Sequence, residues 1–275
     1  MLDFTKNLFM NESYLYRFGG IARLYGAKAL DFFYHRHVVI VGLGGVGTWA
    51  AESLARSGIG EITLIDLDDI CMSNVNRQIH ALTQTIGQSK VSAMAARLKQ
   101  INPDIVIHEV EDFVLQDNLT EILPQKVDYL VDCIDSVSNK AALIAHCRRN
   151  KIKIITTGGA GGQIDPTRIE IADLTKTIQD PLASKVRQIL RRDYNFPKDP
   201  KRRFQVKCVF SSEQLVYPTS DGNVCHTKQN ASNVAGMDCS SGFGSSTVVT
   251  GTFGFVAASH VLTYFAAQAY KNKNV

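Results

Sequence analysis

Residues 37–60, HVVIVGLGGVGTWAAESLARSGIG, have the clearest signal for a fold in this sequence. It begins with a run of β-branched residues at 38–41, which is typical of a parallel strand buried on both faces. A glycine-rich turn follows, and residues 46–57 then have the pattern of a helix that ends at a glycine. The stretch therefore predicts a strand, a tight turn and a helix, the unit on which nucleotide-binding sheets are built.

The same alternation of strand and helix continues along the chain. We predict strands over 61–66, 105–110, 128–133 and 153–157, and helices over 89–100, 116–123 and 138–150. Strands that alternate with helices over short loops predict an α/β fold: a doubly wound, mostly parallel, Rossmann-like sheet.

The pattern becomes less regular after residue 160. We predict a strand over 168–174, a helix over 181–193, an exposed polar loop over 195–207, short strands over 206–210 and 215–218, and a final helix. We expect one domain over 1–275, with a nucleotide-binding core over 17–160 and a C-terminal elaboration over 161–275 on the substrate side.

Composition sets broad limits on the class of protein. The chain has 275 residues, is 45% hydrophobic and carries a formal net charge of +4, so charge alone does not indicate a nucleic-acid partner. Its six cysteines include no CxxC pair, which argues against a zinc ribbon or a disulfide framework. The N-terminal residues do not resemble a signal peptide, and we expect a cytoplasmic protein.

One segment near the C-terminus looks unlike the rest. Residues 239–270 contain no Asp, Glu, Lys or Arg, and they are apolar enough to suggest a membrane helix. The glycines, threonines, Ser259 and His260 in this segment favour a buried helix packed on the sheet. Contact of residues 247–267 with a membrane is the alternative.

The glycine turn predicts the ligand class. Gly42 allows the tight turn, Gly44 lets backbone N–H groups approach phosphate, and Gly47 permits close packing of helix on strand. Asp66 ends the next strand, where it can accept hydrogen bonds from ribose hydroxyls. These four residues predict an adenosine nucleotide, but they do not distinguish a redox dinucleotide from ATP.

The next loops distinguish the two. Asn74, Arg77 and Lys90 supply amide and cationic donors that suit an ATP whose α–β bond is broken, because charge then builds on the α-phosphate and on pyrophosphate. Asp135 follows a strand end, where it can hold Mg²⁺ against the phosphates. Taken singly, Arg77, Lys90 and Asp135 also have structural interpretations: a surface arginine, a helix lysine and a helix-capping aspartate. We predict catalytic roles for all four.

These motifs resemble the ubiquitin-activating-enzyme-like adenylating superfamily, the ThiF/MoeB/HesA group. The resemblance runs through G-x-G-G-V-G, D-x-D, S-N-x-x-R-Q, the following Lys and D-C-x-D, and it implies an ATP-dependent adenylation of a carboxylate. It adds Gly45, Asp68, Ser73, Gln78 and Ser136 to the nucleotide site. The full set of predicted nucleotide contacts is Gly42, Gly44, Gly45, Gly47, Asp66, Asp68, Ser73, Asn74, Arg77, Gln78, Lys90, Asp135 and Ser136.

Further segments are similar to one branch, the bacterial tRNA threonylcarbamoyladenosine dehydratases. They are RFGGIARLYG, TTGGAGGQIDP, KTIQDPL and MDCSSGFG. The resemblance implies ATP-driven cyclisation of N6-threonylcarbamoyladenosine in the tRNA anticodon loop, with net loss of water through an acyl adenylate. It also implies Mg²⁺, a homodimer, a monovalent cation near the C-terminal glycines, and sulfur-transfer protein partners.

The chain departs from sulfur-carrier-activating relatives in two ways. It lacks their paired CxxC zinc motifs, which weighs against a protein tail as substrate. Gly20 stands where they insert an arginine into the partner subunit's site, and Arg17 or Arg23 remains a candidate for that role. An adenylyltransferase for a ubiquitin-like or sulfur-carrier protein is the alternative function, and a non-catalytic nucleotide-binding protein or NAD oxidoreductase is a third.

A basic segment is the predicted tRNA contact. Between residues 185 and 207 there are nine Lys or Arg against two acids, with Tyr194, Phe196 and Phe204 between them. Basic groups contact phosphate and aromatic rings stack on unpaired bases, although a solvated loop is the alternative. The candidates are Arg191, Arg192, Lys201, Arg202 and Arg203. We interpret Cys239, His80 and Cys133 as structural residues and not as catalytic groups.

Overall fold

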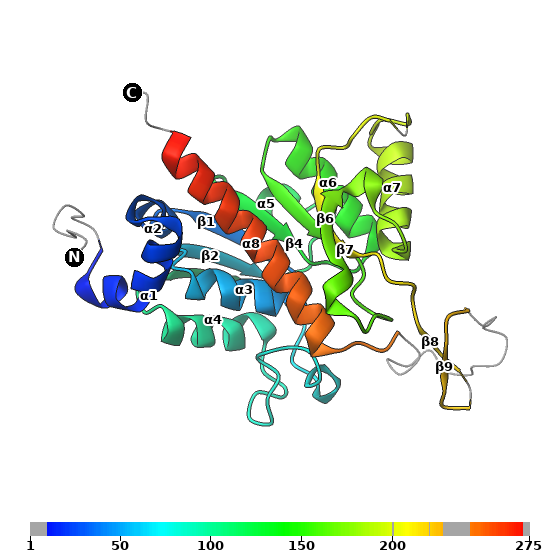
Figure 1. Ribbon diagram of the computed structural model, residues 1–275, viewed down its shortest axis with the longest axis horizontal. Helices are drawn as coiled ribbons and strands as arrows, with labels where there is room; N and C mark the ends of the chain where they lie inside the picture. The colour runs from blue at the N-terminus through cyan, green and yellow to red at the C-terminus, as the bar shows by residue number, and fades with distance from the viewer. Residues whose placement is uncertain (1–9, 200, 220, 228–242, 272–275) are drawn as a thin grey trace.

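The computed structural model describes residues 10–199, 201–219, 221–227 and 243–271, and a seven-stranded sheet forms its centre (Figure 1). The strand order is β3-β2-β1-β4-β5-β7-β6, and only β6 runs antiparallel to its neighbour. The strands are β1 (His37–Val41), β2 (Glu61–Ile65), β3 (Val106–Val110), β4 (Tyr129–Asp132), β5 (Ile154–Thr157), β6 (Ile169–Asp173) and β7 (Lys207–Ser211). The predicted α/β, mostly parallel sheet is confirmed.

Strand β1 lies in the middle of the sheet because both of its faces are apolar. All five of its residues are buried, and the strand pairs with β2 on one side and β4 on the other. The chain order of the strands changes direction between β1 and β4, and ligands of open α/β sheets bind at the carboxyl ends of the strands at such a point. The glycine turn begins there, at Gly42.

Helices cover both faces of the sheet. One apolar core lies under α2 (Ala27–Tyr34), α3 (Gly47–Arg56), α4 (Lys90–Ile101) and α8 (Thr247–Lys271), and the other lies under α5 (Leu119–Ile122), α6 (Val137–Arg149) and α7 (Pro181–Asp193). Strands β6 and β7, from the second half of the chain, extend the same sheet, so both halves share these cores.

The uncharged C-terminal segment forms helix α8, which crosses the sheet beside α3 (red in Figure 1). Gly254 lets the two helices approach, because a Cβ there would lie 2.5 Å from the Val46 carbonyl oxygen. Phe253 and Phe265 are fully or almost fully buried. Among the described residues α8 is the one helix long and apolar enough to span a membrane, but it packs as a core helix, as predicted.

Two N-terminal helices were not predicted. Helix α1 (Glu12–Tyr25) is capped by Asn11, whose side-chain oxygen accepts the Tyr14 N–H, and α2 follows directly after Gly26. The buried Tyr14 hydroxyl donates to the Gly58 carbonyl, in the turn between α3 and β2. Helix α1 therefore packs near the amino ends of the strands, whereas the glycine turn lies at their carboxyl ends.

Smaller elements complete the fold. Short 3₁₀ turns lie at η1 (Met72–Asn74), η2 (Pro166–Arg168) and η3 (Leu174–Lys176), and β8 (Tyr217–Pro218) pairs with β9 (Val224–Cys225). The helix predicted over 116–123 is only the single turn α5.

The loop over 195–207 was predicted to be exposed, but Phe204 and Val206 are buried. The prediction is therefore wrong for these two residues, which anchor the loop to the core.

Candidate active site

A cavity of about 790 Å³ opens at the carboxyl ends of β1, β2, β4 and β5. Eleven predicted nucleotide-site residues line it: Gly42, Gly44, Gly45, Asp66, Asp68, Asn74, Arg77, Gln78, Lys90, Asp135 and Ser136. Gly47 and Ser73 do not line the cavity. All four predicted catalytic residues are thus brought to one cavity: Asn74 and Arg77 from the loop between β2 and α4, Lys90 from the start of α4, and Asp135 from the loop after β4.

The glycine turn forms one wall of this cavity. Gly42 has a φ of +88°, a conformation that favours glycine, and a Cβ there would lie 3.0 Å from the Cys133 backbone. Gly44 has no atom within 4 Å of the position a Cβ would take, so the backbone is open to a ligand. A Cβ on Gly47 would lie 1.9 Å from the Gly42 carbonyl oxygen, which explains why this glycine acts by packing and not by contact with a ligand.

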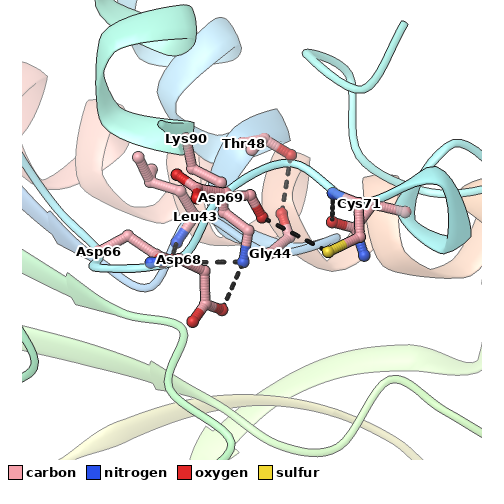
Figure 2. A network of polar contacts seen from close by, with 9 residues as sticks. Leu43, Gly44, Thr48, Asp66, Asp68, Asp69, Cys71 and Lys90 are labelled. Carbon is pink, nitrogen blue, oxygen red and sulfur yellow. Dashed lines mark hydrogen bonds and ion pairs between the residues drawn. The ribbon is translucent and has the colours of Figure 1, made fainter. Parts of the chain in front are cut away.

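Asp66 organises the turn, as Figure 2 shows. Its carboxylate accepts the Leu43 N–H at 2.6 Å and the Asp68 N–H at 2.9 Å. The buried Lys90 ammonium lies 2.6 Å from an Asp68 oxygen and 3.7 Å from an Asp66 oxygen. The two carboxylates therefore hold a single cation, Lys90, at the cavity wall where α4 begins.

The loop between β2 and α4 carries Arg77. An Arg77 Nη donates to the Ser73 carbonyl oxygen at 2.7 Å and to the Asn76 side-chain oxygen at 2.9 Å, so Ser73 acts here through its backbone. The Trp49 ring N–H donates to the Arg77 carbonyl oxygen at 2.9 Å. Asn74 is buried, and its side-chain oxygen accepts the Cys71 N–H at 3.0 Å. These contacts fix the loop and leave the Arg77 guanidinium at the cavity surface.

Asp135 is exposed in the cavity after β4, and its side chain bonds to no other residue that the structure describes. The loop that carries it is fixed by a buried ion pair that the sequence did not predict. The Lys140 ammonium lies 3.0 Å from the Asp132 carboxylate and donates to the Ile134 carbonyl oxygen at 2.7 Å. The other Asp132 oxygen accepts the Thr156 hydroxyl at 2.6 Å, which ties the loop to β5.

Two buried polar atoms in the cavity wall have no partner among the described residues: the Gln78 side-chain oxygen and the Thr250 hydroxyl. A buried polar group without a hydrogen bond costs free energy, so both atoms fit a bound polar ligand. Thr250 lies in the first turns of α8, next to Gly45. The position of Thr250 in the cavity wall was not predicted, because no local motif surrounds it and only the fold brings α8 to the glycine turn.

Two neighbouring groups that we predicted to be structural are uncharged. Burial raises the pKa of the Cys133 thiol to about 12, so it stays protonated at neutral pH. Burial, together with the charges of Lys90 and Arg97, lowers the pKa of His80 to about 4. Both ring nitrogens of His80 are buried without a hydrogen-bond partner in the described part of the chain. Cys133 is therefore not a thiolate nucleophile at neutral pH, and the low pKa of His80 makes its imidazole a weak base.

We expect His80 to make the fold sensitive to acid. Because its folded pKa, about 4, is below the usual 6.5, the unfolded chain binds a proton first, and stability falls as the pH drops from about 6.5 to about 4. The loss attributable to His80 is about 3 kcal/mol. Unfolding by urea at several pH values, in wild type and in His80→Leu, measures it: the variant should lose less stability, and equal slopes would contradict the assignment.

Other predicted residues lie far from the cavity. Arg17 and Arg23 are exposed on α1, which packs near the amino ends of the strands, away from the cavity at the carboxyl ends. Cys239 and most of the glycine-rich segment near it lie outside the described residues.

The predicted tRNA contacts surround a second hollow. Arg202 and Arg203 line it with Arg148 and Arg149 of α6, which were not predicted. The Arg191 guanidinium lies over the Phe204 ring, and Arg192 pairs with Asp193, while Lys201 is exposed. Phe204 is 2% exposed and packs against Phe196, so the prediction that it stacks on bases is wrong.

The hollow and the cavity lie at opposite ends of helix α6. Ser136, directly before the helix, lines the cavity, whereas Arg149, its last residue, lines the hollow. A helix of 13 residues is about 20 Å long at 1.5 Å per residue. A macromolecular ligand is therefore needed to contact both places at once.

The cavity suits a nucleoside triphosphate. It offers glycine backbone, an arginine, a lysine, a free carboxylate, and buried acceptor and hydroxyl groups without partners among the described residues.

A profile of the ThiF family matches residues 20–275, and the chain belongs to this family. The tRNA threonylcarbamoyladenosine dehydratase of Escherichia coli is 56% identical over 260 residues, which cover 94% of this chain and 97% of that protein.

Solved structures agree with this relationship. The E. coli dehydratase in complex with ATP has a TM-score of 0.85 and 52% identity, with 95% of this chain and 98% of that chain covered. Its complex with AMP also has a TM-score of 0.85, with 51% identity, 96% of this chain and 99% of that chain. The E. coli sulfur carrier protein ThiS adenylyltransferase is 36% identical, but over only 46% of this chain and 51% of its own length.

Proposed function

We propose that this protein uses ATP to cyclise N6-threonylcarbamoyladenosine in the anticodon loop of tRNA, with release of AMP and pyrophosphate. The observation that carries the proposal is the convergence of Asn74, Arg77, Lys90 and Asp135 on one cavity beside the glycine turn. The full-length similarity to a dehydratase that has been crystallised with ATP and with AMP supports the same substrate.

The first step is adenylation. A carboxylate oxygen of the threonine group attacks the α-phosphorus of ATP, the new P–O bond forms and the bond to pyrophosphate breaks. The Gly44 and Gly45 backbone binds phosphate, and Asp66 accepts hydrogen bonds from the ribose. Arg77, Asn74 and Lys90 stabilise the negative charge that builds on the α-phosphate and on the leaving pyrophosphate.

The second step is ring closure. A nitrogen or oxygen of the same modified side chain attacks the activated carbonyl, and the carboxylate oxygen leaves with AMP, so the nucleoside loses one water. The reaction is intramolecular, and proximity supplies much of the rate. No side chain of this protein is assigned as a base for this step.

Asp135 is the residue that would hold Mg²⁺. Mg²⁺ is bound by one or two carboxylates together with substrate phosphates, and an unpaired carboxylate at the cavity surface fits that requirement. When bound, the ion neutralises phosphate charge. Ser136 lies beside it at the start of α6.

The remaining parts of the proposal concern partners. In a homodimer, Arg17 or Arg23 of one subunit would act at the cavity of the other, since neither residue lines the cavity of its own subunit. The elaboration over 161–275 supplies the substrate side, with tRNA contacts at Arg191, Arg192, Lys201, Arg202 and Arg203. A monovalent cation, sulfur-transfer partners and a cytoplasmic location belong to the same proposal.

The alternative, an adenylyltransferase for a ubiquitin-like or sulfur-carrier protein, has less support. Paired CxxC motifs are absent from the sequence, and the similarity to such an enzyme covers less than half of the chain.

Mass spectrometry of nucleosides tests the function. Purified protein is incubated with ATP, Mg²⁺ and tRNA that carries N6-threonylcarbamoyladenosine. We expect a nucleoside lighter by one water, formed only when ATP is present. Unchanged nucleoside, together with pyrophosphate release that requires a carrier protein, would instead establish the alternative.

We expect Thr250→Val to weaken ATP binding about tenfold, the effect of losing a hydrogen bond to a charged group. The protein without nucleotide should be as stable as wild type or more stable, because the unpaired buried hydroxyl is removed. Calorimetric titration and thermal unfolding measure both effects. Thr252→Val is the matched control, since that hydroxyl bonds to the Val248 carbonyl oxygen within the helix; equal ATP affinity in both variants would refute a role for Thr250.

We expect Arg202→Gln with Arg203→Gln to weaken tRNA binding and to lower the slope of log affinity against log salt by about two, because each arginine neutralises about one phosphate. Affinity for ATP should not change, since the hollow lies away from the cavity. The control removes the same charge elsewhere, with Lys28→Gln and Lys99→Gln. If both double variants bind tRNA equally, the hollow is not the contact surface.

A further inference from the structure

A second cluster of side chains that can bind a ligand lies near the amino ends of the strands, whereas the cavity lies at their carboxyl ends. His37 begins β1, Glu61 begins β2 and His108 lies in β3. Registers in the sheet pair His37 with Glu61 and Thr63 with His108. Because alternate residues of a strand share a face, the three side chains meet on one face of three adjacent strands.

The donor atoms are close enough to share one ion. One ring nitrogen of His37, a Glu61 carboxylate oxygen and one ring nitrogen of His108 all lie within 4.8 Å of one another. The Glu61 Oε1 is 2.8 Å from His108 Nε2 and 3.6 Å from His37 Nδ1. Ligands of a tetrahedral zinc ion are about 3.3 Å apart, given metal–ligand bonds of about 2.0 Å, so the cluster needs only small side-chain shifts.

The surroundings of His37 suit a metal ligand. Its Nε2 lies 2.8 Å from the Thr63 hydroxyl, the kind of outer contact that fixes the orientation of a ligating imidazole. Its Nδ1 donates to the Lys126 carbonyl oxygen at 3.0 Å and lies 3.6 Å from Glu61 Oε1, so an ion that replaces the proton on this nitrogen meets two oxygen atoms. The carbonyl oxygen or a water is available as a fourth ligand.

An ion can reach the cluster from solvent. The side chains of Glu61 and His108 are 40% and 49% exposed, whereas His37 is 11% exposed and anchors the cluster to the core. Two imidazoles and one carboxylate are the ligands preferred by zinc and its neighbours among the divalent transition metals, while Mg²⁺ and Ca²⁺ prefer all-oxygen sites.

We propose that His37, Glu61 and His108 form a binding site for a divalent transition-metal ion of the zinc class, which joins β1, β2 and β3 where these strands begin. The site is separate from the ATP cavity and does not depend on the proposed tRNA chemistry. Its effect is on stability: an ion that binds only the folded chain raises the free energy of unfolding as its concentration exceeds the dissociation constant.

The test is titration of the metal-free protein with Co²⁺, followed by visible absorption, and then displacement with Zn²⁺. We expect one equivalent to bind, and Zn²⁺ to raise the melting temperature. His108→Ala and Glu61→Gln should each weaken binding at least tenfold and reduce the thermal shift accordingly. Thr63→Val, which removes only the outer contact, should weaken it by about 10- to 100-fold.

The control is His146→Ala, which removes a histidine of α6 outside the cluster and should bind as wild type does. Three outcomes would overturn the proposal: no saturable binding, equal affinity in wild type and His108→Ala, or a thiolate-to-metal absorption band that locates the ion at a cysteine. Circular dichroism of the metal-free variants establishes that they are folded.

Discussion

Arg77→Ala should reduce ATP–pyrophosphate exchange, measured in the presence of the modified tRNA, by about 1,000-fold. A fixed donor aimed at charge that develops in the transition state contributes about 4 kcal/mol, and its loss lowers the rate by that factor. Arg77 lines the cavity beside Gly45, on a loop held by Ser73, Asn76 and Trp49. The loss should therefore fall on the reaction rate more than on ATP affinity.

Arg56→Ala is the matched control, because Arg56 is exposed on α3 and pairs with Glu52 outside the cavity. It should keep wild-type exchange. Thermal unfolding of both variants separates a catalytic effect from a loss of fold. If Arg77→Ala retains exchange within a factor of ten of the control, Arg77 does not act on the phosphates.

Asp135→Asn should also reduce exchange by about 1,000-fold at a fixed, low Mg²⁺ concentration. The substitution keeps the size of the side chain and removes the charge that would hold the ion against the phosphates, an effect of several kcal/mol. Because Asp135 bonds to no other described residue, the fold should be unaffected.

Raising the Mg²⁺ concentration identifies the cause. In Asp135→Asn, exchange should recover partly as Mg²⁺ increases, and the concentration for half-maximal rate should rise above that of wild type. Asp117→Asn, an exposed aspartate in the loop before α5, is the control and should behave as wild type. An unchanged Mg²⁺ dependence in Asp135→Asn would contradict the metal-binding role.

The core of the fold could be predicted because its signals are local. The apolar side chains of β1 and the lack of a Cβ at Gly42 and Gly47 define the first strand, turn and helix, and the structure has them as predicted. Helix α7 has the predicted bounds, and α8 is the predicted buried helix. Helices α1 and α2 were missed because they are held by contacts such as Tyr14 with Gly58, which are distant in sequence.

The contrast between local signals and contacts distant in sequence also applies to the site. Asn74, Arg77, Lys90 and Asp135 belong to short motifs, and the sequence alone selected them. Thr250 has no motif, and it reaches the cavity only because α8 packs along α3.

The ion pair of Lys140 with Asp132 has only a weak signal in the sequence. An aspartate ends a strand, and a lysine lies in the helix that follows. Nothing local indicates that both groups are buried together. Neither Thr250 nor this pair was therefore predicted.

Identification of the products made from ATP shows directly which phosphate bond the protein breaks. In a reaction with modified tRNA, ATP labelled at the α-phosphate should give AMP, with one AMP and one pyrophosphate for each nucleoside that loses water. ADP and inorganic phosphate as products would contradict the account, because the cavity would then be breaking the β–γ bond instead of forming an acyl adenylate.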